Sequence, residues 1–282
     1  MTRRSGLAMA RLAWLVLAVL PASAAAQSSA RSGSDAAPLV IGETFVIESR
    51  TLGESRTINV YLPPQYVADS SVRLPVLYMP DGGIGEDFLH VAGLVQVSVG
   101  NGTMRPFILV GIKNTARRRD LTGPTTVEDD RKIAPVVGGS AAFRSFIRTE
   151  LMPAIRSRYR TTDETAIVGE SLAGLFIVET LLLEPDLFDT WIAFDPSLWW
   201  NGGALVSYAQ DRMDAIAGKR VYLAASRDDV DSLTQRLADL MRAGAPASTE
   251  WHYRSMPEER HATIYHPAAL KAFRWAFEPA EE

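Results

Sequence analysis

The chain has 282 residues, 47% of them hydrophobic, and its 29 Lys and Arg against 33 Asp and Glu give a formal net charge of −4. This length and apolar content can bury one large core, whereas the slightly acidic balance argues against a general binder of nucleic acid or anionic membranes. The absence of cysteine excludes disulfides, thiol nucleophiles, cysteine-bound zinc and iron–sulfur clusters.

The first 26 residues have the pattern of a secretory signal peptide. Arginines precede an apolar run over 12–20, and small residues follow at 24–26. The run is shorter than the ~20 residues that a membrane-spanning helix needs. We therefore expect a cleaved leader over 1–26, a disordered lead-in over 27–40, no stable membrane span after cleavage, and an exported protein, periplasmic or secreted.

The next segments predict the first half of a sheet. Residues 43–50 and 56–62 alternate with period two, which predicts an antiparallel hairpin. Nearly continuous apolar runs over 74–79 and 106–112 are typical of parallel strands buried on both faces. Between these two runs, residues 87–99 are helix-like.

Strand and helix patterns then alternate to the end of the chain. They comprise a helix over 141–159, a strand ending near 168, a helix from about 175, a strand over 190–194, a helix within 203–217, a strand over 220–225, a helix over 232–243, a strand over 249–254 and a helix over 267–277. This alternation predicts an α/β fold: a doubly wound, mostly parallel sheet with antiparallel N-terminal edge strands, in a single domain over 41–282. In such sheets ligands bind at the carboxyl ends of the strands.

The most informative motif is Gly-Glu-Ser-Leu-Ala-Gly over 169–174. A β-branched run over 166–168 leads into it, and an apolar helical run over 175–178 follows. A serine on a sharp strand-to-helix turn is typical of a nucleophile elbow, so Ser171 is the candidate nucleophile. The alternative is that Ser171 only caps the helix, a favoured position for serine.

A serine nucleophile needs an imidazole as its base, and the chain has four histidines. His90 lies in a predicted surface helix, His252 lies within a strand, and His266 precedes a proline at a helix start. His261 lies in the loop between the last strand and the last helix, where an α/β hydrolase carries its base. We therefore predict His261 as the general base, with a solvated loop histidine as the alternative.

A carboxylate is expected to orient this imidazole. The loop after the strand over 220–225 offers Asp228, our first choice, and Asp229, a close second. Asp195, after the preceding strand, competes with them, although it also suits a turn residue before a proline.

An oxyanion hole needs two backbone donors. One is expected to be the N–H of Leu172, next to the nucleophile. The other is expected from the glycine pair that follows the strand over 74–79, with Gly83 preferred over Gly82, because glycine lets backbone approach a ligand closely. The alternative for this glycine pair is an ordinary turn.

Two loops at the same sheet edge are candidates for the substrate pocket. Trp199 and Trp200 offer aromatic surface, although adjacent tryptophans often belong to a core. Arg117 and Arg119 could meet an anionic part of a substrate, since guanidinium groups bind carboxylates well. Their alternative is a solvated loop with local ion pairs.

These motifs together resemble the Putative esterase (esterase D-like) family of α/β hydrolases over residues 42–278. That family includes siderophore esterases, feruloyl and acetyl esterases and S-formylglutathione hydrolase. The resemblance is carried by the segments over 76–82, 110–120, 169–176 and 196–200 and by His261. It implies the α/β-hydrolase fold and hydrolysis of a small-molecule ester.

The sequence thus predicts an exported serine esterase that cleaves carboxylic esters through an acyl-enzyme. Siderophore-type and feruloyl or acetyl esters are the candidate substrates, and the chemistry needs neither metal nor organic cofactor. Two alternatives stay open: an acyltransferase with the same Ser–His machinery, and a catalytically silent hydrolase fold used as a binding module.

Overall fold

The computed structural model describes residues 37–279. The predicted leader over 1–26 and most of the lead-in over 27–40 lie outside the described residues. From Ile41 onward the chain builds one sheet flanked by helices. None of the helices within residues 37–279 is both long and apolar enough to cross a membrane.

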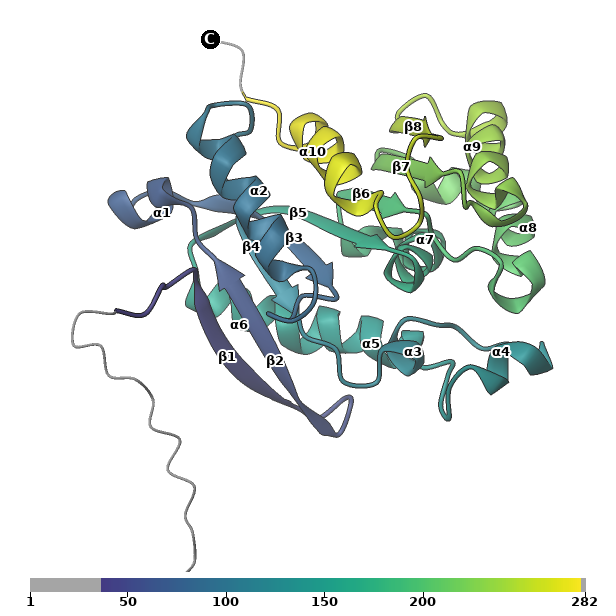
Figure 1. Cartoon of the computed structure of the whole chain (residues 1–282), viewed down its shortest axis with the longest axis horizontal. Helices are drawn as coiled ribbons and strands as arrows, with labels where there is room; N and C mark the ends of the chain where they lie inside the picture. The colour runs from purple at the N-terminus through teal and green to yellow at the C-terminus, as the bar shows by residue number, and fades with distance from the viewer. Residues whose placement is uncertain (1–36, 280–282) are drawn as a thin grey trace, which may run out of the picture. The chain divides into compact units, whose positions relative to one another are not determined.

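The sheet has eight strands in the order β1-β2-β4-β3-β5-β6-β7-β8 (Figure 1). Their bounds are β1 Glu43–Ser49, β2 Glu54–Tyr61, β3 Leu74–Pro80, β4 Ile108–Ile112, β5 Thr161–Glu170, β6 Thr190–Phe194, β7 Arg220–Ser226 and β8 Glu250–Met256. β2 is antiparallel to both β1 and β4, and every other pairing is parallel. The predicted doubly wound, mostly parallel sheet with antiparallel leading strands is confirmed.

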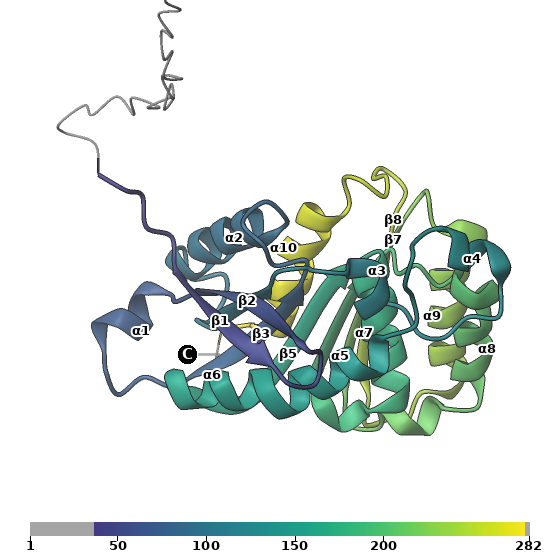
Figure 2. The same cartoon turned by 90° about the horizontal axis from the view of Figure 1, so that it is seen from below.

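Helices cover both faces of this sheet. The α-helices are α1 Pro64–Ala68, α2 Phe88–Gly100, α3 Arg117–Asp120, α4 Glu128–Lys132, α5 Ser140–Phe146, α6 Met152–Arg158, α7 Leu172–Leu183, α8 Ala204–Gln210, α9 Leu233–Gly244 and α10 Tyr265–Ala276. α2 and α10 lie on one face, and α5 to α9 lie on the other (Figure 2).

Successive residues of the central strand β3 enter the two cores in turn. Val76 and Tyr78 pack in the core beneath α5 to α9, whereas Leu77 and Met79 pack in the core beneath α2 and α10. Side chains of a strand alternate between the two faces of a sheet. A strand buried on both sides therefore needs the continuous apolar run that predicted it.

The helix predicted over 141–159 is interrupted. α5 and α6 are joined by a π-helical turn over Ile147–Leu151, in which the Met152 N–H donates to the carbonyl of Ile147, five residues back. The next residue, Pro153, has no N–H for the α-helical ladder, so the backbone widens by one residue here.

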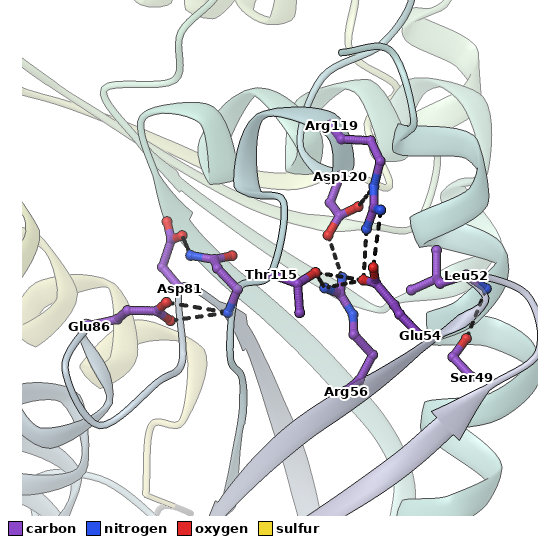
Figure 3. Close-up of polar contacts among 10 residues, drawn as sticks. Ser49, Leu52, Glu54, Arg56, Asp81, Glu86, Thr115, Arg119 and Asp120 are labelled. Carbon is purple, nitrogen blue, oxygen red and sulfur yellow. Dashed lines mark hydrogen bonds and ion pairs between the residues drawn. The ribbon is translucent and has the colours of Figure 1, made fainter. Parts of the chain in front are cut away.

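A buried ion-pair network fixes the segment after β4 (Figure 3). Arg56 on β2 is 1% exposed, and its guanidinium lies 2.5 Å from the carboxylate of Asp120 on α3. Arg119 pairs with the same carboxylate at 2.7 Å and with Glu54 at 2.8 Å. Because every charge has an opposite partner, the network ties α3 to the antiparallel edge of the sheet.

Replacing Asp120 by alanine is expected to lower the free energy of unfolding by about 1.5–3 kcal/mol, because Arg56 loses the more buried of its two carboxylate partners in the described part of the chain and keeps only Glu54, at 3.1 Å. Urea denaturation measures the change. The matched control is Asp239→Ala, which removes the partner of Arg242 in an exposed pair and should cost about 0–1 kcal/mol. Equal losses in both variants would contradict a stabilising role for the buried network.

Candidate active site

Ser171 occupies a strained turn between β5 and α7. Its backbone has φ +61° and ψ −122°, a conformation that non-glycine residues adopt rarely. Its N–H donates to the carbonyl of Phe194 at 3.0 Å, and its own carbonyl accepts from the N–H groups of Ser197 at 3.0 Å and Leu175 at 2.9 Å. In the part of the chain that the structure describes, the Ser171 side chain makes no capping hydrogen bond. The turn therefore has the form of a nucleophile elbow rather than of a simple helix cap.

The small residues of the motif let strand and helix approach this closely. A Cβ added to Gly169 would lie 2.5 Å from the methyl group of Ala173, and one added to Gly174 would lie 2.9 Å from Cα of Pro196. Both distances are shorter than real contacts allow. The two glycines are thus required where α7 crosses β5 and the loop after β6.

His261 reaches the same region from the loop between β8 and α10. Its Nδ1 lies 3.3 Å from Oδ2 of Asp195, and its Nε2 lies 3.7 Å from Oε1 of Glu170. Its backbone N–H donates to Asp228 at 3.0 Å. The side chain is 45% exposed, so one ring nitrogen is fixed by a carboxylate while the imidazole stays open to solvent.

Asp195 is the carboxylate that contacts the imidazole. It directly follows β6, is 4% exposed, and accepts hydrogen bonds from the N–H of Ser226 at 2.6 Å and from its hydroxyl at 2.5 Å. Burial by itself raises the pKa of Asp195, but the hydrogen bonds from His261 and Ser226 outweigh burial and hold this pKa below its ordinary value. The carboxylate is therefore charged near neutral pH.

Within the described residues, neither Asp228 nor Asp229, the predicted partners of the ring, forms a hydrogen bond to the imidazole. Asp228 accepts the backbone N–H of His261, and Asp229 accepts the N–H and hydroxyl of Thr234 at the start of α9. The reason is the strand order. β6 lies directly beside β5, so the loop after β6 begins next to the elbow, whereas the loop after β7 begins one strand farther away. The signal in the sequence was an aspartate immediately after that adjacent strand.

Ser171 and His261 line one cavity at the carboxyl ends of the parallel strands, where ligands bind in such sheets. Its volume is about 180 Å³, and it is open to solvent. The residues that line it are Ser171, Asp195, Pro196, Ser197, Leu198, Trp199, Asp228, Asp229, Val230, Leu233 and His261. Ser171 Oγ lies 3.4 Å from Oγ of Ser197, a buried neighbour that the sequence analysis did not identify.

The four residues predicted for the substrate pocket lie in different environments. Trp199 lines the cavity, but Trp200 is 4% exposed and donates from Nε1 to the carbonyl of Gly123 at 3.0 Å, so it belongs to the core. Arg117 pairs with both carboxylate oxygens of Asp81 at 2.7 and 2.8 Å.

Neither predicted arginine lines the cavity within residues 37–279. Arg119 belongs to the ion-pair network around Glu54 and Asp120 (Figure 3). The structure thus contains local ion pairs in this loop, which was the alternative interpretation.

The two backbone groups expected to bind the oxyanion differ in whether their N–H groups already donate a hydrogen bond. Leu172 begins α7, so its N–H has no acceptor within the helix and can donate to a ligand. The N–H of Gly82 donates to the carbonyl of Ile112 at 3.0 Å, and that of Gly83 donates to the carboxylate of Glu86 at 2.6 Å. Neither glycine N–H is therefore a free donor here, and Gly83 could serve only after Glu86 moves away.

Glu170, between β5 and the nucleophile candidate, is an ionisable group that the sequence analysis left without a role. Burial raises its pKa to about 7, and the negative charges of Asp87 and Asp195 act in the same direction. The pKa of His261 is raised by its hydrogen bond to Asp195 and further by the charge of Glu170. Nε2 of His261 lies 3.7 Å from Oε1 of Glu170, so the charge of each group changes the pKa of the other.

The comparisons with known proteins agree with this geometry. Residues 49–274 match the protein family described as "Putative esterase". Ferri-bacillibactin esterase BesA of Bacillus subtilis is 27% identical over 84% of this chain and 90% of its own length. The siderophore triacetylfusarinine C esterase of Aspergillus fumigatus is 32% identical over 61% of each chain.

A solved structure gives the same result. The crystal structure of an IroE-like serine hydrolase from Shewanella oneidensis superposes with a TM-score of 0.75, at 29% identity over 84% of this chain and 80% of that one. The family match extends from the end of β1 into α10, and thus covers both the elbow and the loop of His261. The chain therefore belongs to the Putative esterase family and is a carboxylic ester hydrolase.

Proposed function

We propose that this chain is a serine esterase that hydrolyses siderophore-type esters, with Ser171 as nucleophile, His261 as general base and Asp195 as the carboxylate that orients the base. The observation that carries the proposal is that Ser171 and His261 line one cavity, with Asp195 on the far nitrogen of the imidazole. This is the arrangement of groups that activates an otherwise unreactive hydroxyl.

The reaction proceeds in two halves. Ser171 Oγ attacks the ester carbonyl while its proton passes to Nε2 of His261, and the resulting oxyanion accepts a hydrogen bond from the N–H of Leu172. Collapse breaks the bond to the alcohol, which leaves with the proton from His261. Water then repeats the sequence on the acyl-enzyme and releases the acid. The Asp195 carboxylate stabilises the imidazolium in both halves.

Among the described residues, Ser171 and His261 form no direct hydrogen bond, and the Ser171 Oγ lies 3.4 Å from Oγ of Ser197. Catalytic hydrogen bonds are often long in unliganded enzymes and shorten when substrate binds. Both side chains line the same cavity, and the His261 side chain is 45% exposed, so the proposal requires that the imidazole and the hydroxyl approach each other when substrate binds.

Two observations support the substrate class and the choice of water as acceptor. Of the two relatives described above, one is named as a ferri-bacillibactin esterase and the other as a siderophore esterase, and the cavity is open to solvent. His261 is 45% exposed, so water reaches the base readily, which favours hydrolysis over acyl transfer. We further propose that the protein is exported, to the periplasm or beyond, on the basis of the pattern over 1–26.

A fluorophosphonate probe followed by peptide mapping tests the proposal. Covalent labelling is expected on the peptide that contains Ser171 and on no other. The substrate class is tested by comparing kcat/KM for a trilactone siderophore, methyl ferulate and p-nitrophenyl acetate, with the first expected to be highest. Labelling of a different serine would overturn the site, and a higher kcat/KM for methyl ferulate would overturn the substrate class alone.

Replacing Glu170 by glutamine is expected to move the acidic limb of the kcat/KM–pH profile to lower pH. Hydrolysis needs neutral His261, and the Glu170 charge favours the protonated imidazole, so removing that charge lowers the pKa at which the base becomes active. The matched control is Glu164→Gln, at an ion pair with Arg105 near the opposite end of β5, which should leave the profile unchanged. An acidic limb that stays in place or rises in the Glu170 variant would contradict the coupling.

A further inference from the structure

Two histidines that the proposed esterase chemistry does not use meet beside the active site. His90 lies in the first turn of α2 and His266 in the first turn of α10, and these two helices contact each other on one face of the sheet. The Nδ1 atoms of the two rings are 3.3 Å apart, and the ring centroids are 5.4 Å apart. His266 is exposed and His90 is about one-third exposed, so the pair is open to solvent.

The separation of the two nitrogens fits a shared metal ion. Zinc–imidazole bonds are about 2.0–2.1 Å long, which at a tetrahedral angle places two ligand nitrogens about 3.3–3.4 Å apart. The observed Nδ1–Nδ1 distance of 3.3 Å has this value. Without metal this contact is a hydrogen bond in which one Nδ1 donates and the other accepts. A metal ion would replace the shared proton and bind both nitrogens.

The surroundings of His90 prepare it to bind a metal. Oδ1 of Asp87 lies at an ion-pair distance of 3.3 Å from Nε2 of His90, and its negative charge favours the tautomer with the ring proton on Nε2. In that tautomer the lone pair is on Nδ1, facing His266. A carboxylate behind a histidine is the usual outer-shell partner of a metal-bound imidazole. Tyr265 packs its ring edge-on against His90, at 5.0 Å between centroids and 85° between planes, and restricts the ring further.

The local charge favours a cation. The charges of Asp87 and Glu170 act on each other, and both act on the buried Tyr265 that packs against His90. Arg117, whose charge also acts on Glu170, is paired with Asp81 by two hydrogen bonds. Asp87, at 3.3 Å from Nε2 of His90, supplies a negative charge beside the proposed ion.

We propose that His90 and His266 form a binding site for a divalent transition-metal cation of the Zn²⁺ type. The described residues hold no group of three or more His, Asp or Glu placed to share one ion, so the site offers two imidazoles and leaves the other positions to water. The ion would bridge α2 to α10. The loop before α2 contains Gly83 and Glu86, and the loop before α10 contains His261, so the bridge ties together two loops that flank the active site.

Calorimetric titration of the full chain with ZnCl₂ at pH 7.5 tests the proposal. Wild type is expected to bind one more Zn²⁺ per chain than either His90→Ala or His266→Ala. The control His252→Ala, whose ring packs on Trp275 away from the pair, should bind as many ions as wild type. Asp87→Asn should keep the site but weaken it about tenfold, as expected for loss of an outer-shell carboxylate.

Thermal unfolding gives a second readout that does not depend on activity. Zn²⁺ should raise the Tm of wild type and of His252→Ala, because a ligand bound only by the native state stabilises it, and should leave the Tm of His90→Ala and His266→Ala unchanged. Circular dichroism without metal verifies that each variant is folded. Equal stoichiometry in wild type and both alanine variants would overturn the site, as would a stoichiometric loss confined to His261→Ala, which would place the ion at the catalytic imidazole.

Discussion

Replacing Ser171 by alanine is expected to lower kcat for ester hydrolysis about 10⁶-fold, the loss found when a triad nucleophile is removed from a serine hydrolase. The variant keeps the cavity, the imidazole and the N–H of Leu172, so substrate should still bind with little change in affinity. The rate falls because the variant lacks the hydroxyl that forms the acyl-enzyme.

The measurement is single-turnover hydrolysis of a p-nitrophenyl ester, with fluorophosphonate labelling in parallel. Ser207→Ala, an exposed serine on α8, is the matched control and should retain both activity and labelling. Activity that survives in the Ser171 variant would remove the proposed mechanism. Wild type that neither hydrolyses esters nor takes up the probe would instead favour a catalytically silent binding module.

Replacing Asp195 by asparagine is expected to lower kcat about 10⁴-fold, as when the triad aspartate of a serine protease becomes asparagine. Asparagine has nearly the same shape but no charge. It therefore stabilises the imidazolium poorly, and its amide can donate to Nδ1 of His261 and hold the wrong tautomer. Circular dichroism and urea denaturation establish that the loss is catalytic, since Asp195 also accepts two hydrogen bonds from Ser226.

Asp228→Asn is the matched comparison for this variant. Asp228 contacts only the backbone N–H of His261, and an asparagine oxygen can accept the same hydrogen bond. We expect a loss of about tenfold or less, the size of one weakened charge-assisted hydrogen bond. An equal loss of kcat in the two variants would indicate that Asp228, in the loop after β7, orients His261 as much as Asp195 does.

The pattern of apolar residues along the chain was sufficient to predict the architecture, because it reflects which side chains of each strand and helix are buried. Apolar runs such as 74–79 and 106–112 belong to strands that are covered on both faces, and they became β3 and β4 at the centre of the sheet. The alternating segments 43–50 and 56–62 became the antiparallel leading strands β1 and β2. Hydrophobic patterns of this kind predict strands and helices correctly because they show which face of each element packs against the core.

The elbow was equally visible in the sequence. Ser171 lies between two glycines of the motif. Gly169 and Gly174 are required where α7 packs closely against β5 and the loop after β6. The loop position of His261, between the last strand and the last helix, was also sufficient to bring it to the cavity that Ser171 lines. Here chain order alone indicates which sheet edge a residue reaches.

Contacts between loops were decided only by the tertiary structure. Asp195, Asp228 and Asp229 all follow parallel strands, and which of them contacts the imidazole depends on strand order and on the local capping that occupies Asp229. The N–H of Gly83 is taken by Glu86, and Arg117 and Arg119 are taken by nearby carboxylates. The sequence by itself thus determined the fold, the nucleophile candidate and the base candidate. The tertiary structure decided which carboxylate contacts the imidazole, which backbone donors are already bonded, and that His90 meets His266. Side chains at loop ends have several possible partners that are near in space and far apart in the chain.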